Sequence, residues 1–451
     1  MPGWRDGATR GTWERDGEHG HQARPRARTT SWEAGVMAAA QAAAYGDEEA
    51  ARARVRQLAD RALRGDAGGL SDALGNQLVD AVTACWDRGW QPADLTHVVG
   101  RRLKTEHRRV LAEIVALEAV PYVYAVNADP HWLAQVDAVT PTTAPPDRHG
   151  LLAHWTASRG DTTVAVQVAV ETLGMLWRLP AQPRLCPPPS AWDEAPTPPN
   201  GSRWRTAGPD RSHRGPVGGT DPKVTQRVRA LLAKAESTDF PEEAEAFTAK
   251  AQELIARHAI DQAMLEAGAD EPGLGAAGRR LLVDDPYAKA KSLLLNEVVA
   301  ANRCSSVWHP DFSMSTVFGQ PGDLDAVELL FTSLLTQATA AMVTAGRTAG
   351  TQSRERSFRQ SFLVAFASRI GERLRAATAM AVDDARARHG DSVLPVLADS
   401  EATALAARTE AFPRLRTQRI STSNYQGWVA GQAAADAAHL GPEPAINPAS
   451  I

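Results

Sequence analysis

Apolar residues recur every three or four positions over most of this chain, which is the spacing of amphipathic helices. In the first part of the chain the pattern predicts helices over residues 47–65, 71–89, 96–120 and 161–179. Gly65 and Gly89 are stop signals after two of these segments, and Ser71 is a candidate N-cap. Residues 37–180 are therefore expected to form a helical N-terminal domain.

A second helical pattern, over residues 221–266, predicts a hairpin of two helices. Its apolar positions lie on one face of each helix: Val224, Val228, Leu231, Leu232 and Ala235 in the first, then Ala244, Phe247, Ala251, Leu254 and His258 in the second. Between them, Asp239 is a candidate cap and Pro241 stands in a first turn, where its missing N–H is not needed. The hairpin is locally well specified.

The pattern over residues 282–440 predicts an α-rich domain with a small antiparallel β insert. Helices are expected over residues 285–301, 323–344 and 357–388, the last anchored by Phe358, Phe362 and Phe366. Two short β-like runs flank the tripeptide His309-Pro310-Asp311, which suggests a hairpin of strands. The predicted fold class is therefore mainly α.

Breaks in composition separate these units. Residues 181–220 are rich in Pro and Gly without an apolar period, so they are expected to be a linker. Residues 1–36 are expected to be a disordered tail or a mis-assigned start, and residues 441–451 a second tail.

Composition limits the functional classes. The 451-residue chain has 43% hydrophobic residues and a net charge of −4, which allows sizeable cores and gives no global argument for nucleic-acid binding. Its three cysteines, Cys85, Cys186 and Cys304, are far apart and encode neither a disulfide framework nor a zinc ribbon. No signal peptide or membrane span is expected, so the predicted location is cytoplasmic, without membrane partners. No cofactor or metal site is predicted.

The hairpin sequence resembles the bacterial and phage family called domain of unknown function 2786 (DUF2786). The positions that carry the resemblance are Leu231, Leu232, Ala235, Ser237, Thr238, Glu243, Ala244, Ala251, Gln252, Leu254 and His258, over about residues 223–260. The downstream region is similar to the one that often follows this domain. The resemblance implies a bacterial setting linked to phages or mobile elements, and it implies no reaction.

Several clusters of reactive side chains have a structural and a chemical interpretation. Glu242, Glu243 and Glu245 lie about four helical turns from His258, so one helix cannot bring them to one ion, and a structural role is preferred. Gly273–Gly278 matches a dinucleotide fingerprint without the required strand and helix, so a linker is preferred. His309 and Asp311, near Cys304, are interpreted first as a turn and second as a metal or acid/base site.

Basic residues are the remaining candidates for binding. Arg101, Arg102, Lys104, Arg108 and Arg109 are expected on one helix, and a later helix carries Arg369 and Arg373. One face of the first group could follow a phosphate backbone, although a solvated basic face is the simpler interpretation.

The sequence therefore favours a non-enzymatic helical interaction protein that associates with another protein, with a second copy of itself, or with nucleic acid through these basic residues. The alternative is a metal-dependent hydrolase or nuclease with a site in residues 282–440, assembled around His309, Asp311 and Glu328. A purely structural helical scaffold is the third interpretation.

Overall fold

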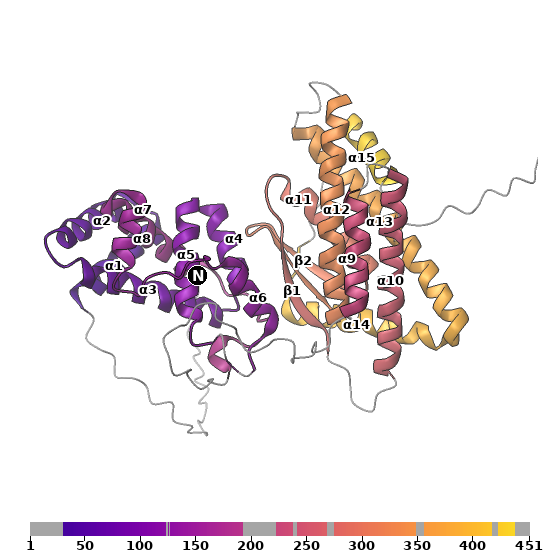
Figure 1. The fold of residues 1–451 in the computed structure, drawn as a ribbon, viewed down its shortest axis with the longest axis horizontal. Coiled ribbons are helices and arrows are strands. Elements are labelled where there is room, and N and C mark those ends of the chain that lie inside the picture. Colours follow the sequence, from indigo (N-terminus) through magenta and orange to yellow (C-terminus); the bar gives the residue numbers. More distant parts are fainter. Residues whose placement is uncertain are drawn as a thin grey trace, which may run out of the picture.

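The computed structural model describes residues 30–122, 125, 127–192, 222–237, 241–267, 275–348, 356–416 and 423–437. The fold is mainly α-helical with one small antiparallel sheet, as predicted. Figure 1 shows two helical lobes with the strands between them. The N-terminal lobe comprises residues 30–192 and the C-terminal lobe residues 222–437.

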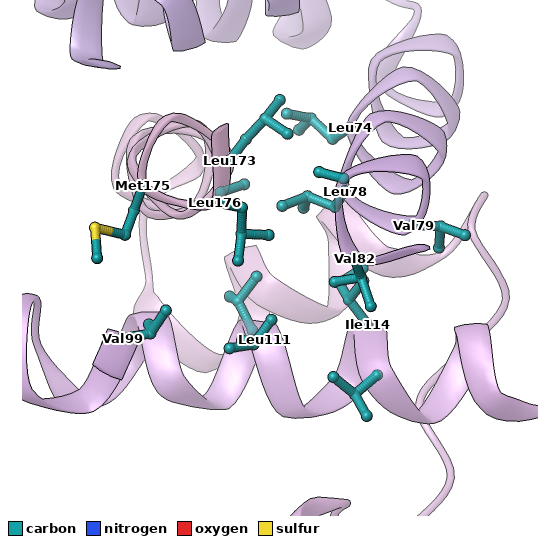
Figure 2. Close-up of a cluster of buried hydrophobic side chains, with 14 of the residues drawn as sticks. Leu74, Leu78, Val79, Val82, Val99, Leu111, Ile114, Leu173, Met175 and Leu176 are labelled. Atoms are coloured by element: carbon teal, nitrogen blue, oxygen red, sulfur yellow. The ribbon is translucent and has the colours of Figure 1, made fainter. Parts of the chain in front are cut away.

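The N-terminal lobe is a bundle around one apolar core. Its helices are α1 (Ser31–Tyr45), α2 (Glu48–Leu63), α3 (Ala67–Asp87), α4 (Pro92–Arg102), α5 (Thr105–Ala119), α6 (Pro130–Val139), α7 (Leu151–Arg159) and α8 (Thr162–Arg178). Figure 2 shows side chains from α3, α5 and α8 converging, among them Leu78, Leu111 and Leu176, all fully buried. Helix α3 lies at the centre because it contacts α1, α2, α5, α7 and α8.

Three boundaries in this lobe differ from the sequence-based expectation. Helix α1 begins at Ser31, capped by Thr30, and buries Trp32, so the lobe starts before residue 37. Asp66, not Ser71, caps α3; the Ser71 hydroxyl is buried and donates to the carbonyl of Arg148. The helix expected over residues 96–120 is two helices, because the chain breaks at Leu103 and α5 restarts after Lys104.

The C-terminal lobe begins with the predicted hairpin, α9 (Pro222–Ser237) and α10 (Pro241–Ala267). It continues with α11 (Ala288–Ala301), α12 (Pro321–Thr348), α13 (Arg356–His389), α14 (Val393–Ala411) and α15 (Tyr425–Ala437). The core residues of the hairpin include Val228, Leu232, Ala251 and Ile255, which join the stacked rings of Phe358, Phe362 and Phe366 of α13 in one cluster. The prediction is therefore confirmed for Val228, Leu232, Ala235 and Ala251, which are buried, whereas Leu254 and His258 are half-buried and the buried Ile255 lies next to the predicted stripe.

The sheet has three antiparallel strands in the order β1-β3-β2: β1 (Ala277–Leu282), β2 (Ser305–His309) and β3 (Met314–Gly319). The strands β2 and β3 form the predicted hairpin, with His309 opposite Met314. Strand β1 was not expected; it pairs with β3 so that Arg280 lies opposite Thr316. Its first residues belong to the segment interpreted as a glycine-rich linker.

The sheet joins the two lobes because its two faces bury different neighbours. Leu281 and Val317 point into the core of the C-terminal lobe. On the other side, Met314 and the turn residue Phe312 belong to the core of the N-terminal lobe, where Phe312 meets Trp90 edge to face at 5.2 Å between ring centroids. The β insert is thus an interface element.

A buried ion pair between Arg280 and Asp94 also links the two lobes. The Arg280 guanidinium donates to the Asp94 carboxylate at 2.6 Å and to the carbonyls of Gly89 and Pro183 at 2.8 and 2.7 Å. The side chains of Arg280 and Asp94 are 0% and 2% exposed. A charge pair buried this completely is held by its mutual contact and by the added carbonyl acceptors.

The first part of the expected linker is packed against the N-terminal lobe. The amide of Gln182 donates to the carbonyl of Arg88, and Arg184 donates to the carbonyl of Asp87. Trp192 meets Trp132 edge to face at 5.1 Å. The linker interpretation therefore fails for residues 181–192. Residues 193–220, the expected tails at 1–29 and 441–451, and the side chains of Glu242, Glu243 and Glu245 lie outside the described part of the structure.

Helix α12 differs from expectation in one respect, because its segment Pro321–Ala345 is long and apolar enough to cross a membrane by length and composition. In this fold Val327, Leu330 and Leu334 of α12 are fully buried in the core of the C-terminal lobe. A core helix of a soluble domain satisfies the same criterion, so α12 is weak evidence for a membrane location.

Candidate functional site

The five basic residues expected on one helix lie around a corner between two helices. Arg101 and Arg102 end α4, Lys104 is in the break, and Arg108 and Arg109 are in the first two turns of α5. A Cβ atom on Gly100 would lie 3.2 Å from Cδ of Arg108, so the start of α5 packs directly on the end of α4. We call these five residues the basic corner, and all five are exposed.

Two residues of the basic corner are engaged at the seam between the lobes. Arg101 forms an ion pair with Asp285, and its side chain is only 26% exposed. Arg102 donates to the carbonyl of Asp311 at 3.0 Å, with its guanidinium over the ring of Phe312. Both interactions hold the loops beside the sheet, so these two arginines are partly structural.

Lys104, Arg108 and Arg109 are exposed, and none of them takes part in an ion pair found among the described residues. The break that presents them is fixed by His107, whose Nδ1 accepts from the amide of Lys104 at 3.2 Å. The same imidazole is buried and its Nε2 lies 2.7 Å from Glu171, which lowers the pKa of that carboxyl. The histidine therefore acts as a cap for α5 and locks α5 onto α8.

Arg369 and Arg373, the other predicted binding residues, attach α15 to α13. Arg369 pairs with Asp436 and with Glu372. Arg373 donates to the carbonyls of Ala435 and Asp436, which lie at the C-terminal end of α15, and burial lowers its pKa. Cations at this end of a helix satisfy unpaired carbonyls and oppose the helix dipole. The structure thus gives both residues a structural role.

The alternative hydrolase site is not assembled from the residues expected for it. His309 and Thr316 share one sheet face, with 2.9 Å between Nε2 and the hydroxyl, and burial lowers the pKa of His309 to about 4. Glu328 pairs with Arg279, which points to the opposite face because it is the neighbour of Arg280 in β1. Asp311 is exposed in the turn. Within the described residues, no three His, Cys, Asp or Glu side chains converge on a possible metal position.

A cavity lies beside the predicted hairpin, between α9, α10, the start of α12, and α14. It is small, with a volume of about 50 Å³, and we call it the hairpin cavity. Its apolar walls include Val228, Ile255, Ala259, Ala326 and Leu329. His258, the last residue of the predicted stripe, lines it and is half-buried.

An ion pair stands at the polar end of the hairpin cavity. Arg303 donates to Asp323 at 2.9 Å, and the two side chains are 10% and 6% exposed. Asp323 is in the first turn of α12, where a carboxylate is favoured by the helix dipole. Sequence reasoning singled out neither residue, because their pairing depends on a turn with Arg303 in a left-handed conformation, φ 56°.

A second hollow, of about 650 Å³, opens between the lobes and is lined by α6, α9, β1 and α12. His131, Arg229 and Glu236 line it together with Arg279 and Glu328. Arg279 is paired with both Asp325 and Glu328, at 2.8 and 2.9 Å. Burial and the nearby Arg279 lower the pKa of His131, so this imidazole is neutral at pH 7. Two of the acids here, Asp325 and Glu328, are therefore paired with Arg279.

Comparison with known proteins gives one match. Residues 223–262 match a family model described as protein of unknown function (DUF2786). No curated protein and no solved structure matches the chain. The matched residues span α9 and most of α10, including the helix faces that line the hairpin cavity. The resemblance predicted from the hairpin is therefore confirmed: the chain carries a DUF2786 segment at residues 223–262.

Proposed function

We propose that this protein is a non-enzymatic helical interaction protein that binds nucleic acid through the basic corner, in the cytoplasm of a bacterium. The observation that carries this proposal is the break between α4 and α5. It places five basic residues around one exposed corner, where a continuous helix would spread them along its length.

The contacts that the five basic residues already make within the protein determine which of them can bind nucleic acid. Lys104, Arg108 and Arg109 supply cations for phosphate oxygens, whereas Arg101 and Arg102 are partly used by the seam between the lobes. The corner contains no aromatic residue on which a base could stack. Binding should therefore depend on the phosphate backbone, with little preference for sequence.

The test is binding of the purified full-length chain to a labelled DNA duplex and to a single strand of equal length, at increasing salt. The expected result is detectable binding at about 50 mM salt that weakens steeply as salt increases, because counterion release drives phosphate contacts. Binding that is undetectable at this salt concentration for both probes would overturn the proposal.

The protein partner expected from the sequence has a candidate surface on α12. Leu335, Thr339 and Val343 line an exposed face of this helix, and Val343 is 51% exposed. We infer that a second copy of the chain covers this face. Sedimentation of the wild-type chain and of Val343→Lys tests the inference: a dimer that the substitution dissociates is expected, and a monomeric wild-type chain at all concentrations would contradict it.

A further inference from the structure

We propose that the two acids that follow β1, Asp284 and Asp285, form an autoinhibitory contact that competes with nucleic acid for the basic corner. They belong to the C-terminal lobe and meet α4 of the N-terminal lobe, where the two lobes join (Figure 1). This regulation rests on the nucleic-acid binding proposed above and acts on that same site. The basic residues concerned are Arg101 and Arg102, which both have partners in the C-terminal lobe.

Asp285 already occupies one arginine of the basic corner. Its carboxylate forms an ion pair with Arg101, whose side chain is 26% exposed. The pair joins the two lobes, because Arg101 lies at the end of α4 and Asp285 lies between β1 and α11. A guanidinium that already holds a carboxylate attracts a phosphate less strongly than an unpaired cation does, because the two charges oppose each other at the phosphate.

Asp284 adds a second carboxylate on the same side of α4. It lies 3.5 Å from Nδ1 of His97, and His97 and Arg101 are four residues apart, on one face of the helix. Burial lowers the pKa of His97, so its imidazole is neutral at pH 7 and leaves the charge of Asp284 in place. Lys291 donates to the backbone carbonyl of Asp284 at 2.9 Å, which holds these acids to their own lobe. Two carboxylates are therefore fixed beside the end of α4.

The ion pair of Asp285 is exchangeable, unlike the buried pair that also joins the lobes. The Asp285 carboxylate is 62% exposed, and ion pairs with this exposure contribute little to stability because water and salt screen them. The side chains of Arg280 and Asp94 are 0% and 2% exposed, so this second pair keeps the lobes together when the first one opens. A phosphate can therefore replace Asp285 on Arg101 without separating the lobes.

Arg102 is held beside the same seam by a neutral acceptor. It donates to the carbonyl of Asp311 at 3.0 Å, and its guanidinium lies 5.1 Å from the ring centroid of Phe312. A phosphate is the stronger partner, because it is charged and can accept two N–H groups of one guanidinium. Nucleic acid that recruits both arginines must displace both seam contacts. By reciprocity, these contacts lower the affinity of the free chain for nucleic acid.

The experiment measures binding of a labelled DNA duplex to the full-length chain and to Asp285→Asn, at increasing salt. The substitution removes the charge that holds Arg101 and keeps the shape of the side chain. One additional phosphate contact should increase the slope of log Kd against log salt by about 0.9, which corresponds to binding about tenfold tighter at about 50 mM salt. Thermal unfolding checks that the variant is folded, as expected for a substitution of an exposed carboxylate.

Two further variants separate the release of Arg101 from a general change of charge. Glu106→Gln removes one exposed carboxylate from the first turn of α5, within the corner itself, and takes part in no ion pair found among the described residues. It releases no arginine, so the slope should stay that of the wild-type chain. In a chain that carries Arg101→Gln, the substitution Asp285→Asn should no longer change the slope, because the arginine that it releases is absent.

The outcomes distinguish this regulation from the binding on which it rests. Undetectable binding by both the wild-type chain and Asp285→Asn at about 50 mM salt would overturn the proposed function and the autoinhibition together. Three results would overturn the autoinhibition while nucleic-acid binding stands. These are a wild-type slope in Asp285→Asn, an equal increase of the slope in Glu106→Gln, and an increase that persists in the Arg101→Gln chain.

Discussion

At the scale of single residues, the buried carboxyl group of Glu118 shows how the fold compensates a polar group for the loss of water. Glu118 is 4% exposed, yet its carboxylate accepts from the indole N–H of Trp86 at 2.7 Å and from the hydroxyl of Thr83 at 3.0 Å. Burial nevertheless raises the pKa of Glu118 from an ordinary 4.5 to about 7, because these donors only partly offset the loss of water.

This pKa makes stability depend on pH. The folded chain holds the Glu118 proton more tightly than the unfolded chain, so the free energy of unfolding should fall as pH rises from about 4.5 to about 7, by about 3 kcal/mol. Glu118→Gln should remove this part of the pH dependence. The side-chain amide of the introduced glutamine can still accept from the indole N–H of Trp86. Its NH₂ group can donate to the Thr83 hydroxyl oxygen while that hydroxyl donates to the carbonyl of Val79.

Urea unfolding at pH 5 and pH 8 measures the effect for both chains. An unchanged difference between the two pH values in Glu118→Gln would show that another group is responsible.

At the scale of elements, the sequence predicted those helices that are specified by neighbouring residues alone, through an apolar period, a turn and a cap. The hairpin α9–α10 combines an apolar period with a turn and a proline in the first turn, so it was predicted from sequence. Its core includes the expected Val228, Leu232 and Ala251, together with Ile255, which the predicted stripe did not contain. The break between α4 and α5 was missed because Val98, Leu103 and Val110 continue one apolar stripe across it. The signal for the break is a contact of His107 with the amide of Lys104, which no spacing reveals.

Strand β1 was missed for a related reason. Its sequence places Arg279 and Arg280 side by side in the strand, which suggests a solvated segment. Their partners lie far away in the chain: Asp94 is 186 residues before Arg280, and Glu328 is 49 residues after Arg279. The burial of these arginines follows from long-range packing and not from local preference.

Close packing of α15 on α13 gives a prediction for two glycines. A Cβ atom on Gly427 or Gly431 would lie 2.4 or 2.2 Å from the carbonyl oxygen of Phe358 or Phe362, so neither position has room for a side chain. Gly431→Ala should displace α15 and cost about 1–3 kcal/mol. Hydrogen exchange of residues 425–437 should then become faster.

Gly275→Ala is the matched control, since no atom of the described residues lies within 4 Å of a Cβ atom at that position. If Gly431→Ala and Gly275→Ala have the same stability and the same exchange rates, the close approach of α15 to α13 is wrong.

At the scale of the whole molecule, the sheet couples two lobes that the sequence presents as separate domains. Arg280 contributes the only buried guanidinium among the described residues that reaches from the C-terminal lobe to a carboxylate of the N-terminal lobe. Arg280→Met should leave Asp94 buried without its partner and cost about 3–5 kcal/mol. Its neighbour Arg279 pairs with carboxylates that are 37% and 48% exposed, so Arg279→Met should cost about 1 kcal/mol or less.

Denaturant unfolding of the two variants compares these costs. Equal small effects would contradict a coupling role for the buried pair. A second transition that appears in Arg280→Met alone would show that the lobes unfold independently once the pair is lost.

For the candidate functional residues, the sequence likewise shows which residues are present, and the fold decides which residues they contact. The sequence identified the basic residues but not their use: Arg369 and Arg373 hold α15, and Arg101 and Arg102 reach the seam of the lobes. The hairpin cavity depends on Arg303 and Asp323, which only the folded chain brings together with His258. Composition and spacing therefore predicted the mainly α-helical architecture, whereas the binding residues stay a prediction.

The central claim is that Lys104, Arg108 and Arg109 carry nucleic-acid binding, and the most direct test is the salt dependence of duplex binding. Replacing all three residues by Gln should reduce the slope of log Kd against log salt by about 2 to 3, at about 0.9 for each lost phosphate contact. The control replaces Arg54, Arg56 and Arg64, three exposed arginines of and after α2, and should leave the slope unchanged. A slope that both triple variants share with the wild-type chain would contradict the claim.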